Sequence, residues 1–159
     1  MPPAPILDPA TLSCDSLVYT REQIYKMLPQ QFEFSQLDGV MYVDKENMVF
    51  GAYRDVRADE WWCRGHMPHQ PIFPGVLMVE SAAQLSALAQ QILVPEEGIM
   101  GFAGIDEAKF RDSIFPPARI IFVGHVIDTR MRKFQCRVQS FVNGRMAFEG
   151  IIAGTKLKI

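Results

Sequence analysis

The chain has 159 residues, of which 48% are hydrophobic and 21% are charged, so its composition fits one folded domain and excludes a disordered protein. Its formal net charge is -2 and no long basic run occurs, which excludes the charge pattern typical of nucleic-acid-binding proteins. The three cysteines are widely spaced and form no CxxC pair, so neither a disulfide framework nor a zinc knuckle is indicated.

Residues 1–19 are predicted to form an extended N-terminal arm, because four prolines occur among the first nine residues. They lack the basic start and apolar segment of a secretory signal, so we expect a cytoplasmic protein. Residues 20–159 are predicted to form a single domain, since neither a repeat nor a linker interrupts them. Its first element is a short helix, which begins with a capping box of Thr20 and Gln23 and ends at Pro29.

Strands are predicted on both sides of a second, longer helix. Residues 36–57 are rich in Val, Tyr, Met and Phe, and the turn residues Lys45 to Asn47 divide them into two strands. The first of the later strands contains a glycine bend, and Asn143-Gly144 predicts a β-hairpin between the last two. These later strands are expected at residues 99–110, 119–128, 133–142 and 145–157.

Residues 76–94 are apolar almost all the way round, a pattern typical of a buried helix. The stretch contains one Glu and three Gln residues, so it is too polar and too short to predict a membrane span. One such helix, followed by several antiparallel strands, predicts an α+β fold in which a curved antiparallel sheet wraps around one long buried helix.

Glu80 is the anomaly of the long helix, because its neighbours are apolar. A buried charge is costly unless it is paired or neutralised, so we expect burial to raise the pKa of Glu80 and to favour a protonated acid. Gln84 lies four residues further on the same helix face and can hydrogen-bond the carboxyl group. The alternative is a glutamate that reaches solvent at a helix end or a dimer face.

His66 precedes the helix in a Gly- and Pro-rich segment that implies a fixed backbone path. A neutral imidazole is a suitable base, although a loop histidine bonded to the backbone is an alternative. Pro74-Gly75-Val76 opens the helix, and its first N–H groups can polarise a thioester carbonyl. We expect no metal site, because no complete ligand set has a familiar spacing.

Residues 65–84, GHMPHQPIFPGVLMVESAAQ, closely resemble the signature of the bacterial 3-hydroxyacyl-[acyl-carrier-protein] dehydratases of type II fatty acid synthesis, which are hotdog-fold enzymes. The family pattern runs Gly-His-Phe-Pro, Pro-Ile, Pro-Gly-Val-Leu, a Glu and Ala-Gln. Weaker similarity extends over most of residues 20–155 and includes residues 104–111. The resemblance therefore implies a hotdog fold and a hydro-lyase activity.

The resemblance also implies a role for each matching residue. His66 would remove the C2 proton of a (3R)-hydroxyacyl thioester, and protonated Glu80 would donate to the departing C3 hydroxyl. Gly75, with Val76 beside it, would bind the thioester oxygen, and Gln84 would orient the acid. The product would be a trans-2-enoyl thioester, and no cofactor or metal would be needed. The dehydratase-isomerases of the family have Asp at the acid position, so the Glu implies the single-function type.

The partners implied by the resemblance are acyl carrier protein and further copies of this chain. The family forms homodimers or trimers of dimers, in which the His of one subunit faces the Glu of the other. Because the carrier is acidic, we expect a basic docking patch, although solvated surface charges are an equally good interpretation. The candidates are Lys109, Arg111, Arg130, Arg132 and Lys133.

Three other functions fit part of the pattern. Departures from the family at Met67 and Gln30-Gln31 change the rim of the site, which fits a dehydratase of a secondary pathway such as polyketide or aryl-polyene assembly. A hotdog thioesterase lacks this order of His, Pro-Gly and Glu. A non-catalytic acyl-binding protein would have no need for the intact set of site residues.

Overall fold

The computed structural model describes residues 1–95, 98–130 and 132–157. Two helices, seven strands and two 3-10 turns occur in these ranges. Their bounds are η1 Pro9–Thr11, β1 Tyr19–Thr20, α1 Arg21–Met27, η2 Phe32–Phe34, β2 Gly39–Asp44, β3 Val49–Val56, α2 Gly75–Leu93, β4 Ile99–Phe110, β5 Ala118–Asp128, β6 Phe134–Val142 and β7 Arg145–Leu157.

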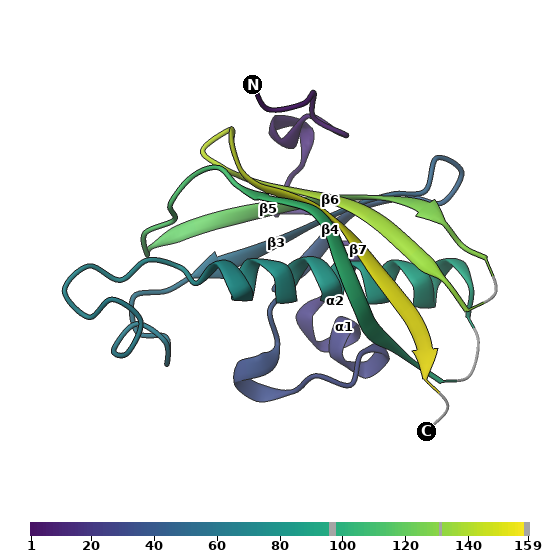
Figure 1. The fold of residues 1–159 in the computed structure, drawn as a ribbon, viewed down its shortest axis with the longest axis horizontal. Coiled ribbons are helices and arrows are strands. Elements are labelled where there is room, and N and C mark those ends of the chain that lie inside the picture. The colour runs from purple at the N-terminus through teal and green to yellow at the C-terminus, as the bar shows by residue number, and fades with distance from the viewer. Residues whose placement is uncertain (96–97, 131, 158–159) are drawn as a thin grey trace.

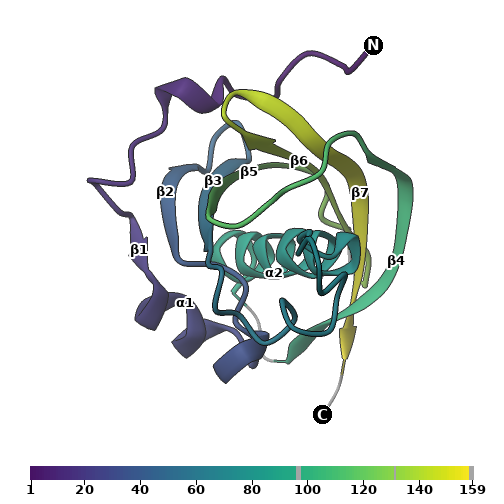
Figure 2. The ribbon, with the colours of Figure 1, turned by 90° about the vertical axis from the view of Figure 1, so that its left-hand side faces the viewer.

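The strands of the described residues form one antiparallel sheet in the order β1-β2-β3-β5-β6-β7-β4. The sheet arches over α2 along the length of the helix (Figure 1). Viewed from the end, the strands curl around α2, and α1 lies outside them near β1 and β2 (Figure 2). The predicted α+β architecture, a curved antiparallel sheet around one long helix, is confirmed.

Two local predictions about the sheet are confirmed. Asn143 and Gly144 have φ values of 50° and 75°, the left-handed backbone that a type I′ hairpin requires at both positions. The bend expected in β4 is also present, because its pairing with β7 shifts register between Phe102 and Gly104. Such bulges increase the local twist, which helps the sheet to curl around the helix.

The capping box at the start of α1 is confirmed as well. The Thr20 hydroxyl accepts a hydrogen bond from the Gln23 N–H at 3.3 Å, and the Gln23 side-chain oxygen accepts one from the Thr20 N–H at 2.9 Å. Ile24 on the inner side of the helix is fully buried. The local sequence therefore fixes where α1 begins, and the apolar residue fixes which side faces the domain.

The helix α2 packs one face against the concave side of the sheet, and on the other face Val76 is 76% exposed. By length and hydropathy α2 could cross a membrane, a criterion that the core helices of soluble proteins also meet. The nine buried residues of α2 are Leu77, Met78, Ser81, Ala82, Gln84, Leu85, Ser86, Leu88 and Ala89.

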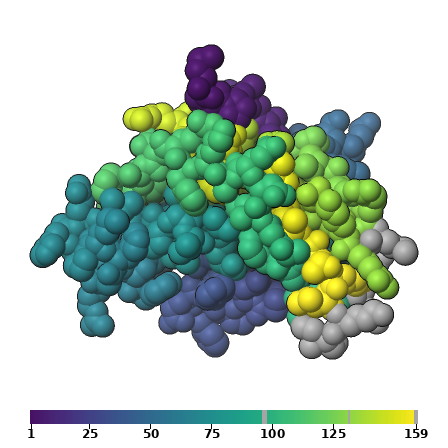
Figure 3. Space-filling model, in the orientation of Figure 1, coloured from purple at the N-terminus to yellow at the C-terminus, as the bar shows by residue number. Residues whose placement is uncertain are grey.

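The N-terminal arm lies on the convex side of the sheet, away from α2 (Figures 1 and 3). One buried amide, that of Gln139 in β6, accepts a hydrogen bond from the Ile6 N–H at 2.8 Å and donates one to the Ala4 carbonyl at 3.1 Å. Leu12 packs against β3 where Gly51 leaves room for it. The arm is therefore fixed to the outer surface of the domain.

Candidate active site

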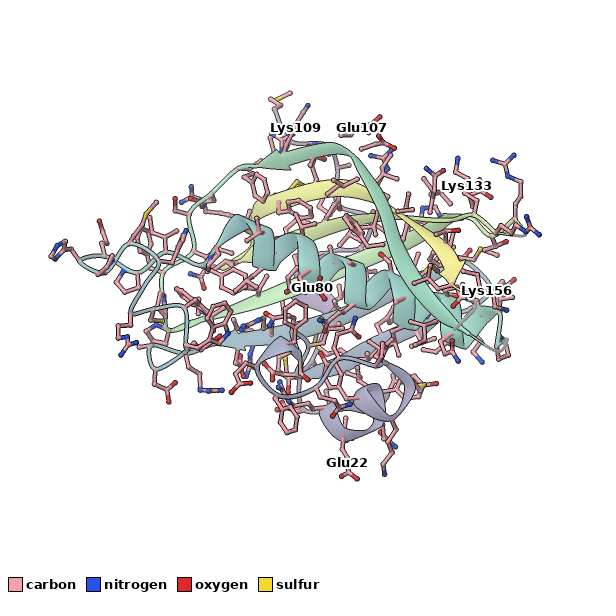
Figure 4. The ribbon with its side chains drawn as sticks, turned by 60° about the horizontal axis from the view of Figure 1, so that its bottom comes forward. Glu22, Glu80, Glu107, Lys109, Lys133 and Lys156 are labelled. Carbon is pink, nitrogen blue, oxygen red and sulfur yellow. The ribbon has the colours of Figure 1, made fainter. Side chains whose placement is uncertain are left out.

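Glu80 lies in the second turn of α2 and is partly buried (Figure 4). It lines a cavity of about 60 Å³ together with Gln30, neighbouring residues of α2, and residues of β4 and β7. Burial raises the pKa of the Glu80 carboxyl above its ordinary value, although a hydrogen bond from Gln84 acts in the opposite direction. A carboxyl group in this environment keeps its proton to a higher pH and can donate it to a bound molecule.

The amide of Gln84 holds the Glu80 carboxyl in place. Its Nε2 donates to Glu80 Oε1 at 2.8 Å and to the Phe34 carbonyl at 2.7 Å. Its Oε1 accepts from the Tyr25 hydroxyl at 2.7 Å and from the Gln36 N–H at 3.0 Å. Burial raises the pKa of Tyr25 to about 12, so the hydroxyl remains a donor. Since a flipped amide would lose these bonds, only one orientation of Gln84 satisfies them, and it directs a donor at Glu80.

His66 lies in the loop between β3 and α2, held by two hydrogen bonds to that loop. Its N–H donates to the Trp62 carbonyl at 2.7 Å, and its Nδ1 lies 2.8 Å from the Ile72 carbonyl. A carbonyl can only accept, so the neutral ring carries its proton on Nδ1. The lone pair is then on Nε2, the ring nitrogen that can take a proton from a bound molecule.

The N-terminus of α2 offers backbone donors beside this loop. Among the residues that the structure describes, no side chain caps the helix at Pro74, and the first N–H groups of a helix have no partner within it. The same end carries the positive pole of the helix dipole, which favours a developing negative charge. A Cβ at Gly75 would lie 2.9 Å from the Phe110 ring. The missing side chain at Gly75 therefore leaves room for this ring, and the contact of its N–H with a thioester oxygen stays a prediction.

Within one chain, His66 and Glu80 do not meet. The described contacts include neither a hydrogen bond nor an ion pair between them. The loop that carries His66 extends beyond the N-terminal end of α2 (Figure 1), whereas Glu80 lies further along the helix. The chain therefore presents a base and an acid at two separate places.

The basic residues predicted to dock the carrier fall into two groups. Arg130, Arg132 and Lys133 line a cavity of about 720 Å³ near the C-terminal end of α2. Lys109 lies near the end of β4, on another part of the surface and well away from Lys133 (Figure 4). Arg111 forms an ion pair with Glu149. The sequence analysis proposed these residues as candidates for one docking patch, and the fold places them in separate groups.

The sequence did not reveal which residues surround the site. Tyr25 and Gln36 were not identified as partners of Gln84, nor was the buried ion pair of Arg54 and Glu60. An arginine in an alternating apolar strand, as in VFGAYRDV, was the available signal for that pair. In the described ranges, no three His, Cys, Asp or Glu side chains are grouped so that they could hold a metal ion.

Comparison with known sequences gives a consistent set of relatives. The model of the FabA-like domain family matches residues 28–151. A Ruminiclostridium cellulolyticum protein named 3-hydroxyacyl-[acyl-carrier-protein] dehydratase FabZ is 32% identical over 134 residues, which cover 84% of this chain and 94% of the relative. A protein of the same name from Sorangium cellulosum is 33% identical over 131 residues, which cover 80% of this chain and 84% of the relative.

Solved structures share the fold. The dehydratase heterocomplex ApeI:P from Xenorhabdus doucetiae matches with a TM-score of 0.69 and 12% identity, covering 85% of this chain and 91% of the other. Cj0977, a sigma28-regulated virulence protein from Campylobacter jejuni, matches with a TM-score of 0.63 and 13% identity, covering 86% of this chain and 97% of the other. At these identities the comparison establishes a common architecture.

Proposed function

The chain belongs to the FabA-like domain family, and from this premise we propose that it dehydrates (3R)-hydroxyacyl thioesters on acyl carrier protein to trans-2-enoyl thioesters in type II fatty acid synthesis, as a cytoplasmic enzyme. One observation carries the proposal. Glu80 is a partly buried carboxyl with a raised pKa, and a fixed Gln84 amide directs it at a small cavity. The curated relatives named for this reaction align with most of the chain.

The proposed reaction uses the groups that the site presents. The Nε2 lone pair of His66 takes the C2 proton of the substrate. The developing negative charge on the thioester oxygen is stabilised by the N–H groups of Gly75 and Val76 and by the helix dipole. Glu80 donates its proton to the C3 oxygen, the C3–O bond breaks, and water leaves as the C2–C3 double bond forms. His66 then loses a proton and Glu80 regains one. No cofactor enters this balance.

We propose a homodimer as the active unit, because the base and the acid of one chain are separated. The partly covered face of α2 and the long edge strand β4 would meet a second copy, so that His66 of one subunit serves the Glu80 of the other. A dimer of this kind is symmetric and contains two equivalent sites. It could assemble further into a trimer of dimers.

The reaction is tested with crotonyl and longer 2-enoyl thioesters, on acyl carrier protein and on coenzyme A, by following the loss of enoyl absorbance. We expect hydration by the wild type and its near loss in Glu80→Gln. Glu22→Gln is the matched control, since this glutamate lies on α1, exposed and paired with Lys26 (Figure 4). A folded protein that hydrates no thioester, or an unimpaired Glu80→Gln variant, would refute the proposal.

The shared site is tested by co-expressing His66→Ala and Glu80→Gln subunits. Each single variant should be inactive as a homodimer. In random assembly half of the dimers are hybrids with one intact site, so about a quarter of the wild-type activity should return. If base and acid belong to the same subunit, the hybrid contains no intact site and activity stays absent.

For the carrier we propose docking at the cavity near the C-terminal end of α2. This cavity shares Met100, Phe134 and Gly154 with the cavity of Glu80, so the two are adjacent. Its basic residues Arg132 and Lys133 would attract an acidic carrier and speed its encounter. Gln90 of α2 lies at the rim of the larger cavity, ten residues after Glu80. At 1.5 Å per residue the two are about 15 Å apart along the helix, a span that an extended thioester arm can bridge.

Charge reversal distinguishes the two groups of basic residues. Arg132→Glu with Lys133→Glu should raise KM for carrier-linked substrates and leave KM for coenzyme A thioesters nearly unchanged. Lys109→Glu is the comparison, because Lys109 lies on another part of the surface (Figure 4). An unchanged carrier-linked KM in the double variant would remove this docking surface from the proposal.

A further inference from the structure

A buried ion pair lies behind the loop that carries His66. Arg54 in β3 and Glu60 in the following loop have side chains that are 6% and 7% exposed. The guanidinium donates to both carboxylate oxygens, from Nη1 to Oε1 at 3.0 Å and from Nη2 to Oε2 at 2.7 Å. This two-point geometry fixes the direction of both groups more strictly than a single contact would.

The pair holds the start of the His66 loop. Glu60 Oε2 also accepts a hydrogen bond from the Trp62 indole N–H at 2.9 Å, and its Oε1 accepts one from the Arg57 N–H at 2.8 Å. The Trp62 carbonyl in turn accepts the backbone N–H of His66 at 2.7 Å. The backbone position of the histidine is thus two hydrogen bonds away from Glu60.

The same pair holds the end of the loop. The Arg54 guanidinium lies 4.8 Å from the centre of the Phe73 ring, and the Trp62 ring meets this ring edge-on at 5.6 Å. Phe73 directly follows Ile72, whose carbonyl accepts the Nδ1 proton of His66. Contacts of the ion pair therefore fix both the backbone and the ring of the histidine.

A third contact leads from the pair to the acid. Arg54 Nε donates to the Gln36 side-chain oxygen at 3.0 Å, and the Gln36 N–H donates to Gln84 Oε1 at 3.0 Å. The Gln84 amide holds the Glu80 carboxyl at 2.8 Å. An unbroken series of polar contacts thus leads from the His66 loop to Glu80 inside one chain.

We propose that Arg54 and Glu60 are positioning residues for the reaction, which keep the Nε2 atom of His66 in its working direction and link the His66 loop to the Glu80–Gln84 pair. The proposal rests on the proposed function. Buried ion pairs contribute little net stability, and paired replacement by apolar residues is often neutral. The role of this pair is to orient the His66 ring, and small misplacements of reacting groups lower the reaction rate strongly. In the proposed dimer, His66 and Glu80 of one chain serve different active sites, so this series of polar contacts would connect the two sites.

The test replaces both members of the pair, because Arg54→Met with Glu60→Met leaves no buried charge without a partner. We expect a folded oligomer whose kcat for enoyl-thioester hydration is at least about tenfold lower, with KM changed by less than about threefold. The matched control is Asp55→Leu with Arg119→Met. That pair is also held at two points, from Nε and Nη2 of the arginine at 2.6 and 2.8 Å, but is half exposed, and its loss should leave kcat unchanged. Wild-type kcat in the folded Arg54/Glu60 variant would overturn the proposal.

A second readout is independent of turnover. In protein with ¹⁵N-labelled histidine, nuclear magnetic resonance distinguishes the two neutral ring tautomers. We expect His66 to carry its proton on Nδ1 in the wild type and in the control pair, and to show a mixture in Arg54→Met with Glu60→Met. If the wild type hydrates no thioester, the proposed function fails, and the tautomer still decides whether the ion pair positions the ring. An unchanged tautomer would overturn the positioning role.

A milder variant covers the case in which the double variant does not fold. Trp62→Phe keeps an aromatic ring against Phe73, although a smaller one, and removes the indole N–H that binds Glu60. We expect a fall in kcat of about threefold or more and a partial loss of the Nδ1 tautomer, since one hydrogen bond to a charged group is removed. A folded Trp62→Phe protein with wild-type kcat and the wild-type tautomer would also overturn the proposal.

Discussion

The two faces of α2 differ in what they contribute. Toward the sheet, Leu85 and Leu88 are fully buried, and this face anchors the core. Away from the sheet, Val76 is exposed and Glu80 lines a small cavity. Gln84 is buried but hydrogen-bonds Glu80, so it belongs to both faces. One face of the helix thus stabilises the fold and the other carries the proposed chemistry. Substitutions on the two faces should therefore change the free energy of unfolding and kcat separately.

The largest effect is expected on the open face. Glu80→Gln should lower kcat by about 10²–10⁴-fold, the usual contribution of a general acid, because an amide cannot donate a carboxyl proton to the leaving oxygen. Thermal unfolding near neutral pH should show no loss of stability, since the amide can still accept the bond from Gln84. A variant that lost activity only by unfolding would contradict the separation of the two faces.

On the sheet-facing side the expectation is the reverse. Leu85→Ala should lower the free energy of unfolding by about 2–5 kcal/mol, because it opens a cavity in the packed core. Denaturant titration measures this loss. Below the unfolding temperature, kcat in the hydration assay should stay within about twofold of the wild type, since the side chain points away from the site. A selective fall in kcat in the folded protein would show that the faces are coupled.

Tyr25→Phe tests the side chain of α1 that supports Gln84. The change removes a donor from Gln84 Oε1 and an acceptor from the Leu37 N–H, which is bonded at 2.7 Å. We expect a loss of about 1–3 kcal/mol in the free energy of unfolding, the cost of leaving buried partners unpaired. The fall in kcat should be much smaller than for Glu80→Gln. An equal fall in kcat in both variants would contradict this expectation.

The smallest effect is a pH dependence of stability. Because burial raises the pKa of Glu80, the native state is favoured while the carboxyl is protonated, and this advantage is lost as the pH rises through the folded pKa. The free energy of unfolding of Glu80→Gln, relative to the wild type, should therefore be greater at pH 8 than at pH 4. Denaturant titrations at the two pH values measure the difference. A difference of the opposite sign would contradict the raised pKa.

The fold was predictable where the signal is local. The Thr20 capping box depends on a residue three positions away, and the Asn143-Gly144 turn depends on two adjacent residues. Strand alternation and the apolar run of α2 are patterns within single segments. The Glu80–Gln84 contact was predictable for the same reason, since it joins one helical turn to the next.

What could not be predicted depends on the placement of distant segments. Tyr25 and Gln36 bond to Gln84 across 59 and 48 positions in the sequence, so their roles follow only from where α1 and the segment before β2 lie beside α2. The glycine at position 75 is explained by the ring of Phe110, which β4 brings to it. No periodicity within one segment encodes these contacts, because each depends on the tertiary placement of two segments far apart in the sequence.

The fixing of the N-terminal arm decides how the protein should be attached to a surface. Ala4 and Ile6 are tied to Gln139 on the convex side, so the first residues leave the molecule away from α2 (Figure 1). The other end is different, because Thr155 and Lys156 of β7 line the basic cavity. A biosensor chip linked through the N-terminus would therefore leave the concave side open to dissolved carrier, whereas a C-terminal linker would crowd the proposed docking surface.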